Sequence, residues 1–178
     1  MTDPVLLLLE TRRSCRSFKP DVPPEEKIRA VLRAGTFAPT GMGKQSPLII
    51  AVTNRELRDR IAEENRKIGG WQTGFDPFYG APVILIVLAD RSTNPRTYLY
   101  DGSCVMANLL NAAAAVGLGS CWIHRAKEEF DAPFGKELLA DLGISGDLEG
   151  IGHVALGYAA QVPAPAAERK KDYVRFVR

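Results

Sequence analysis

The feature that most constrains the fold is an apolar run without alternation, from Val83 to Leu88. A strand with one face in water alternates apolar and polar side chains, whereas a strand covered on both faces is apolar throughout. We therefore expect this run to form a central strand of a sheet whose two faces are both covered. The rest of the chain must supply that cover.

Turn residues and apolar periodicity divide the chain into alternating helices and strands. The segment from Tyr98 to Val116 is Ala-rich and nearly uncharged, which predicts a central helix buried nearly all round. The Gly- and aromatic-rich segment from Gly69 to Pro82 is too long for a plain connector, so we expect a lid or a partner contact. The pattern predicts one domain, 1–178, of the mixed α/β or α+β class. Helices are expected at 4–12, 23–35, 55–68, 98–116 and 134–142, and strands at 48–53, 83–88, 120–123 and 151–159.

Composition argues against several classes of protein. Hydrophobic residues make up 46% and charged residues 25% of the 178 residues, which are ordinary values for a globular protein. The longest apolar run is far shorter than a membrane span, and no basic region precedes the apolar residues from Val5 to Leu9. We therefore expect neither a signal peptide nor a membrane partner. Three widely spaced cysteines, Cys15, Cys104 and Cys121, predict no disulfide framework and no metal site, and favour a reducing cytoplasm.

Both ends of the chain are basic. Residues 10–20 hold four basic and one acidic side chain, with Ser14 and Ser17 among them. Guanidinium forks and hydroxyl donors at this spacing favour binding of a compact dianion such as a phosphate. The alternative is a solvated helix end whose cations offset the helix dipole. Residues 168–178 hold five basic and two acidic side chains, so the two ends can converge on one anionic ligand or can be loose tails that touch nucleic acid.

Three motifs with known chemistry are incomplete in this chain. Gly43-Lys44 lacks the first glycine and the Ser or Thr of a phosphate-binding P-loop. Gly117-Leu118-Gly119 follows a predicted helix and precedes a strand, the reverse of a dinucleotide-binding fingerprint. His124 and His153 lack zinc-ligand spacing, so no metal is expected, and His153 is predicted to be a hydrogen-bonded core residue.

Four segments occur together in order along the chain: Arg12–Phe18, Ala38–Gln45, Gly117–Ile123 and the basic tail. Each segment alone is weak evidence for a family. Together, the four segments resemble the FMN-dependent nitroreductase family over essentially the whole chain. The resemblance implies an α+β fold with a central mixed sheet flanked by helices. It also implies an obligate homodimer that holds FMN in each of two interface clefts.

The family match implies which residues bind the phosphate end of the flavin. Around the phosphate and the ribityl chain it places Arg12, Arg13, Ser14 and Arg16. The basic tail would close over the same phosphate through Arg169 or Lys171. This assignment agrees with the interpretation, based on residue types alone, that the two basic ends form a site for a dianion.

The family match also implies which residues lie at the flavin ring. The partner subunit would line the ring with Pro39, Thr40 and Gly41, with Gln45 nearby. A cation, either Lys44 or Arg16, would stabilise the reduced flavin at its N1–O2 edge. The reactive N5 edge would face the backbone from Ile123 through His124 to Arg125. No side chain is required as an acid or a base, because the flavin carries the chemistry.

The resemblance implies a reductase that takes a hydride from NADH or NADPH. In a ping-pong sequence through flavin N5, the hydride would pass to a small electron-poor acceptor such as a nitroaromatic, a quinone or an enone. One alternative is a non-enzymatic FMN-binding or ligand-sensing module on the same fold. Another is a small nucleic-acid-binding protein that uses its basic ends, although we expect no nucleic-acid partner.

Two departures from the family pattern affect the expected acceptor. Gly43 stands where members often carry Asn, which removes a possible polar contact to the ring. His124 and Arg125 stand where an acidic or small pair is common. Together with Lys127 they predict an unusually basic mouth of the site, unless Arg125 and Lys127 simply begin a solvated helix end.

Overall fold

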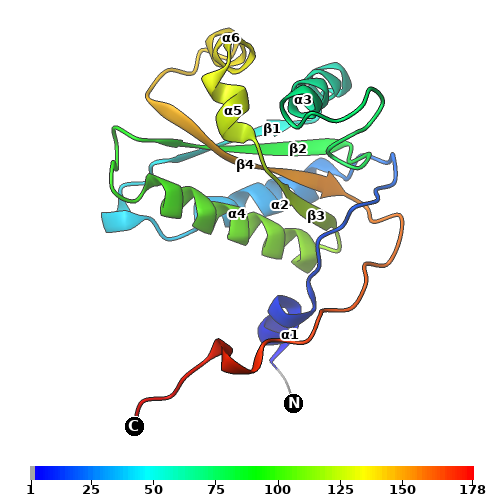
Figure 1. Ribbon diagram of the computed structural model, residues 1–178, viewed down its shortest axis with the longest axis vertical. Helices are drawn as coiled ribbons and strands as arrows, with labels where there is room; N and C mark the ends of the chain where they lie inside the picture. Colours follow the sequence, from blue (N-terminus) through cyan, green and yellow to red (C-terminus); the bar gives the residue numbers. More distant parts are fainter. Residues whose placement is uncertain (1–2) are drawn as a thin grey trace.

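The computed structural model describes residues 3–178, and its centre is one four-stranded sheet with helices on both faces (Figure 1). The strands are β1 (Pro47–Val52), β2 (Val83–Asp90), β3 (Gly119–Ile123) and β4 (Leu148–Gly157), in the order β1-β2-β4-β3. One face is covered by α2 (Glu25–Thr36) and α4 (Tyr98–Ala115), and the other by α3 (Arg55–Ile68), α5 (Ala126–Asp131) and α6 (Pro133–Asp141). Outside the layer of α2 and α4 lie α1 (Pro4–Thr11) and the C-terminal tail (Figure 1).

The α+β class is confirmed, but the sheet is less mixed than expected. All four named strands pair antiparallel. Within residues 3–178 the parallel pairing is limited to an isolated bridge between Ser14 and Ser120. The reason lies in the connection after β1, because the long loop that follows α3 brings the chain back to the same end of the sheet. Val52, the last residue of β1, therefore lies opposite Ile84 near the start of β2.

Strand β2 confirms the expectation of a strand covered on both faces. Every side chain from Val83 to Ala89 is fully buried. Alternate residues divide between two cores, with Ile84 and Ile86 on the face of α3, α5 and α6, and Leu85 and Val87 on the face of α2 and α4. Each such side chain contributes roughly 1.5–3 kcal/mol when fully buried, so β2 anchors both layers.

Local sequence explains where most helices begin. Asp3 caps α1, because its carboxylate accepts a hydrogen bond from the Val5 amide at 2.8 Å, and Asn54 caps α3 by accepting from the Leu57 amide at 2.9 Å. Pro133 begins α6, as the fixed φ of proline favours. Helix α5 was not predicted, because it has only six residues and no side-chain cap. It is held instead by its packing on β4.

Helix α4 is less buried than its composition predicts. The buried side is lined by Asp101, Val105, Met106 and Leu109, whereas Tyr100 on the other side is 71% exposed. The expectation of burial all round is therefore wrong for the single chain, since the sheet covers only one side of the helix. Apolar side chains of α1 are exposed as well. Even so, none of the helices within residues 3–178 is both long enough and apolar enough to cross a membrane.

Candidate functional site

The basic segment after α1 is fastened to the sheet and is not a loose helix end. The Cys15 amide donates to the carbonyl of Ser120 at the start of β3 at 2.9 Å. The Lys19 amide donates to the carbonyl of Tyr158 just after β4 at 2.8 Å, and Ala160 donates to the carbonyl of Ser17 at 2.9 Å. These bonds hold residues 14–19 across the ends of two strands. The backbone of this segment is therefore fixed, whereas the side chains of Arg16 and Lys19 are exposed.

The two basic ends of the chain line the same cavity, named here the basic cavity. It has a volume of about 740 Å³, and the segment from Gln161 to Ala167 forms much of its wall. Its donor groups come from both ends of the sequence, and they are Arg13, Ser14, Arg16, Ser17 and Arg169. The structure thus brings the predicted residues together, except that Lys171 does not line this cavity and Arg12 lines the neighbouring one.

Arg12 and Arg13 carry buried donor atoms that lack an acceptor. Arg13 Nη1 donates to the Arg12 carbonyl at 2.5 Å. Arg12 Nη1 and Arg13 Nε are buried but find no hydrogen-bond partner within residues 3–178. A buried donor without an acceptor costs roughly 1–3 kcal/mol. The arrangement therefore favours an anion that brings its own acceptor oxygens.

The loop that contains Pro39, Thr40 and Gly41 is held by Asp101 of α4. The Gly41 amide donates to Asp101 Oδ1 at 2.8 Å, and Ser46 Oγ donates to Asp101 Oδ2 at 2.8 Å. Burial alone would raise the pKa of Asp101, but the hydrogen bonds from Gly41, Ser46 and Asn94 outweigh it and lower the pKa. The ionised carboxylate therefore fixes the loop.

This loop has a strained, exposed tip and an apolar base. Met42 and Gln45 have φ of 57° and 54°, and Lys44 between them is exposed. Thr40 and Gln45 border a cavity of about 350 Å³ whose other lining residues are mostly apolar. The loop could therefore present both polar groups and an apolar surface to a ligand.

The loop and the basic segment after α1 lie at opposite ends of α4 (Figure 1). Gly41 is bonded to Asp101 in the first turn of α4, whereas Ala114 in its last turn lines the cavity that Arg12 borders. Thirteen residues of helix separate the two points, or roughly 20 Å at 1.5 Å per residue. One chain therefore does not bring the two groups of predicted residues together.

The end of β3 presents a charged residue in an unusual conformation. Ile123 is buried and His124 is exposed. Arg125 has a φ of 81°, in the left-handed region that residues other than glycine rarely adopt. Its Nε donates to Asn65 Oδ1 at 3.1 Å, and its guanidinium lies 4.2 Å from the ring centroid of Trp71.

The basic mouth predicted from three cations is only partly present. His124 and Arg125 lie together at the end of β3, but Lys127 belongs to α5 and pairs with two carboxylates. Its Nζ lies 2.9 Å from Asp131 and 3.3 Å from Glu149, and the hydrogen bond to Asp131 chiefly raises the pKa of Lys127. Lys127 is therefore charged but paired with carboxylates, so it adds less positive potential to the mouth than a free lysine would.

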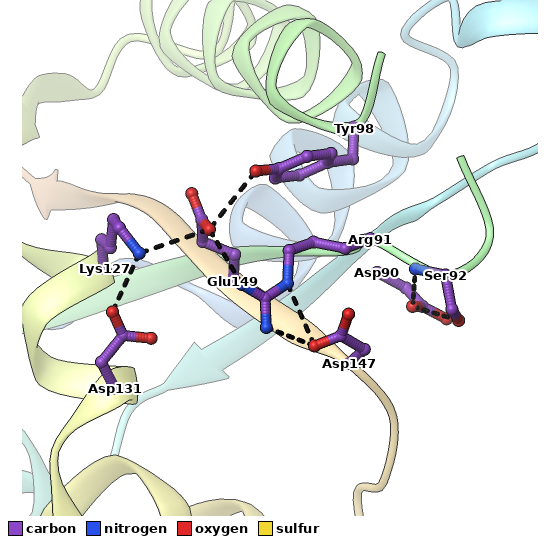
Figure 2. A network of polar contacts seen from close by, with 8 residues as sticks. All are labelled: Asp90, Arg91, Ser92, Tyr98, Lys127, Asp131, Asp147 and Glu149. Carbon is purple, nitrogen blue, oxygen red and sulfur yellow. Dashed lines mark hydrogen bonds and ion pairs between the residues drawn. The ribbon is translucent and has the colours of Figure 1, made fainter. Parts of the chain in front are cut away.

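Glu149 is the centre of the network that holds Lys127 (Figure 2). Its nearly buried carboxylate accepts from Tyr98 Oη at 3.3 Å and from Lys127 Nζ at 3.3 Å. It also lies 3.4 Å from Arg91 Nη1, and Arg91 pairs in turn with Asp147. The network ties the beginnings of α4 and α5 to β4, so it is a structural support.

Comparison with known proteins decides the family. A family model described as "Nitroreductase family" matches residues 9–158. This chain belongs to the nitroreductase family. The α+β nitroreductase fold predicted from the sequence is thereby confirmed.

Solved structures agree with this membership of the nitroreductase family. A nitroreductase with bound FMN from Bacteroides fragilis has a TM-score of 0.86 and 28% identity, with 99% of this chain and 100% of that chain covered. A nitroreductase with bound FMN from Desulfitobacterium hafniense has a TM-score of 0.89 and 25% identity, with both chains fully covered. The similarity thus extends over the whole fold.

A curated relative from Methanothermobacter thermautotrophicus is provisionally named as an NADH dehydrogenase/NAD(P)H nitroreductase. It is 33% identical over 125 residues, which cover 66% of this chain and 59% of the relative. This nitroreductase-family chain therefore matches less than two thirds of that relative's length.

Two polar residues of this family member were missed from the sequence. Asp101 is the only charged residue in the helix predicted at 98–116, and a lone carboxylate in an apolar helix could have indicated a buried hydrogen-bonding role. Asn65 carries no such signal, because it lies in a helix rich in charged residues. Its role depends on contacts that only the tertiary structure creates.

Proposed function

We propose that this nitroreductase-family chain is an FMN-dependent oxidoreductase that uses NADH or NADPH to reduce small electron-poor molecules such as nitroaromatics, quinones or enones. The observation that carries the proposal is the pair of buried donors without acceptors, Arg12 Nη1 and Arg13 Nε, beside the basic cavity. Family relatives solved with bound FMN support it.

The residues present fit the phosphate end of FMN. A phosphate dianion offers several strong acceptors, and Arg13, Ser14, Arg16 and Arg169 offer guanidinium and hydroxyl donors around one cavity. Phosphate oxygens would also satisfy the unpartnered N–H groups of Arg12 and Arg13. The backbone bonds between residues 14–19 and the sheet hold these donors in place before a ligand binds.

The proposed site is completed by a second copy of the chain. The loop of Pro39, Thr40, Gly41, Lys44 and Gln45 lies too far from the basic cavity of its own chain to act on the same ligand. We propose a homodimer in which this loop of one subunit approaches the basic cavity of the other. Apolar side chains left exposed on α1 and α4 support such an interface, because monomers rarely expose large apolar patches.

FMN, when bound, supplies the hydride-transferring ring. The chain itself would bind the phosphate and set the charge around the ring. Ile123 closes the end of β3 with a buried side chain, and the backbone of His124 and Arg125 lies beyond it. The positive charge of Arg125 would attract the phosphates of NAD(P)H. Donor and acceptor would use this mouth in turn, as a ping-pong sequence requires.

Steady-state oxidation of NADH and NADPH by FMN-saturated protein tests the proposal, with a quinone and a nitroaromatic compound as acceptors. We expect acceptor-dependent oxidation with parallel double-reciprocal plots. FMN-saturated Lys127→Ala protein is the matched control and should keep the activity, because Lys127 pairs with Asp131 and Glu149. Protein that retains FMN but oxidises neither nucleotide would instead support the non-enzymatic FMN-binding module.

A further inference from the structure

A fully buried contact between a histidine and a carboxyl group lies between the sheet and α5. His153 of β4 and Glu129 of α5 are 0% and 1% exposed, and His153 Nε2 lies 2.9 Å from Glu129 Oε2. The prediction that His153 is a core residue holds, but neither of its ring nitrogens makes a hydrogen bond within residues 3–178, so the predicted hydrogen bond is absent there. His153 is paired directly with Ile123, the last residue of β3, and its ring meets Phe78 edge-on at 5.4 Å. The pair therefore lies beside the strand end that carries His124 and Arg125.

Asn65 of α3 connects this pair to the end of β3. Its side chain is fully buried, and its Nδ2 donates both to the Glu129 carboxylate and to the His124 carbonyl, the latter at 3.0 Å. Its Oδ1 accepts from Arg125 Nε at 3.1 Å. The orientation of the amide is fixed, because the His124 carbonyl can only accept and Arg125 can only donate.

Arg125 in turn supports the aromatic loop. Its guanidinium stacks on Trp71, and Arg66 donates to the Trp71 carbonyl. Trp71 stands near the start of the segment 69–80 and packs on Phe75, with ring centroids 4.8 Å apart. A continuous series of contacts thus runs from the centre of the sheet to a surface loop.

We propose that Asn65 is a positioning residue: oriented by the Glu129–His153 pair, it holds the His124 carbonyl and the Arg125 side chain so that segment 69–80 docks over the mouth of the site. The inference rests on the proposed function, since the mouth is that of the proposed flavin site. Asn65 acts through Arg125 and Trp71, and the phosphate end of the site is not involved.

The most informative substitution reverses the donor and acceptor roles of the Asn65 side chain. Asn65→Asp keeps the shape and the acceptor for Arg125 but loses both Nδ2 donors and sets a second carboxylate against Glu129. The double variant Asn65→Asp with Glu129→Gln exchanges the amide and the carboxylate, so that a hydrogen bond between α3 and α5 can form again in the opposite direction. Recovery in the double variant would show that the contact matters, and not merely the residue type.

Hydrogen exchange of FMN-saturated protein measures the docking directly. In Asn65→Asp we expect amide exchange in segment 69–80 to rise at least about ten-fold, because each of the two lost buried hydrogen bonds is worth roughly 1 kcal/mol. Exchange in β2 should stay unchanged, and the double variant, which regains the contact between residues 65 and 129 but not the one to the His124 carbonyl, should restore part of the protection. Unchanged exchange in segment 69–80, a rise shared equally by β2, or no recovery in the double variant would overturn the proposal.

Kinetics and a second variant complete the test. We expect KM for NAD(P)H to rise in Asn65→Asp while the FMN dissociation constant stays within about two-fold, because the basic cavity is remote. If Asn65→Asp fails to fold, Arg125→Lys serves as the second variant. It removes the hydrogen bond from Arg125 Nε to Asn65 Oδ1 and should raise amide exchange in segment 69–80 as well. An inactive wild type would refute the proposed function alone, because the exchange result does not depend on turnover.

Discussion

Replacing Arg125 by glycine and by alanine separates backbone strain from side-chain contacts at one position. Its φ of 81° costs a residue with a Cβ roughly 1–2 kcal/mol and costs glycine almost nothing. Both variants lose the hydrogen bond to Asn65 and the stack on Trp71, worth roughly 1 and 0.5–1 kcal/mol. Only Arg125→Gly recovers the strain. The glycine variant should therefore be more stable than the alanine variant by about 1 kcal/mol.

Urea unfolding of the two variants measures this difference, which corresponds to a midpoint shift of roughly 0.3–0.5 M for slopes of 2–3 kcal/mol per M. The matched control is Glu137, an exposed residue inside α6. There alanine should be more stable than glycine by about 1 kcal/mol, because glycine weakens a helix interior. The sign of the glycine–alanine difference must therefore reverse between the two positions. An alanine variant at 125 as stable as the glycine variant would refute the strained conformation.

Three further outcomes follow from the site. Arg12→Ala and Arg16→Ala should each weaken FMN binding by about one to two decades, as the loss of a charge-assisted hydrogen bond predicts; FMN titrations like those of wild type would show that the phosphate is bound elsewhere. The pKa of Asp101 is lowered in the folded protein, so its stabilising contribution is complete above the unfolded-state pKa and is lost as pH falls through the folded-state pKa. Below about pH 4, the unfolding free energy of wild type should thus fall more steeply than that of Asp101→Asn, and equal slopes would argue against an ionised Asp101 as the support of the 39–45 loop. Light scattering at low micromolar concentration should report about twice the chain mass, and a monomer that still holds FMN would defeat the two-chain site.

The parts of the fold predictable from sequence are those that local pattern determines. The uninterrupted apolar run from Val83 to Leu88 was enough to place a central strand, because only a strand covered on both faces tolerates that pattern. The N-caps Asp3 and Asn54 likewise marked helix starts. Helix α5 escaped prediction because packing against β4, and not its own six residues, holds it in place.

The candidate site likewise has a part that the sequence predicted and a part that it could not predict. The clustering of Arg12, Arg13 and Arg16 predicted an anion site, and the family resemblance predicted Arg169 or Lys171 beside it. The structure places Arg13, Arg16 and Arg169 at one cavity and Arg12 at the neighbouring one. The backbone bonds that hold this segment across β3 and β4 could not be predicted, since they join residues about 100 or more positions apart. The buried contacts of Asn65 escaped prediction for the same reason, because a polar residue in a charged helix looks like ordinary surface.

The central claim is that the chain binds FMN and reduces it with a nicotinamide nucleotide. The most direct test is the visible absorption spectrum of FMN-reconstituted protein, freed of unbound flavin by gel filtration and recorded without oxygen before and after addition of NADH or NADPH. We predict oxidised-flavin bands that elute with the protein at about one FMN per chain and that bleach when the nucleotide is added. Protein that retains no FMN, or retained FMN that stays oxidised with both nucleotides, would contradict the account.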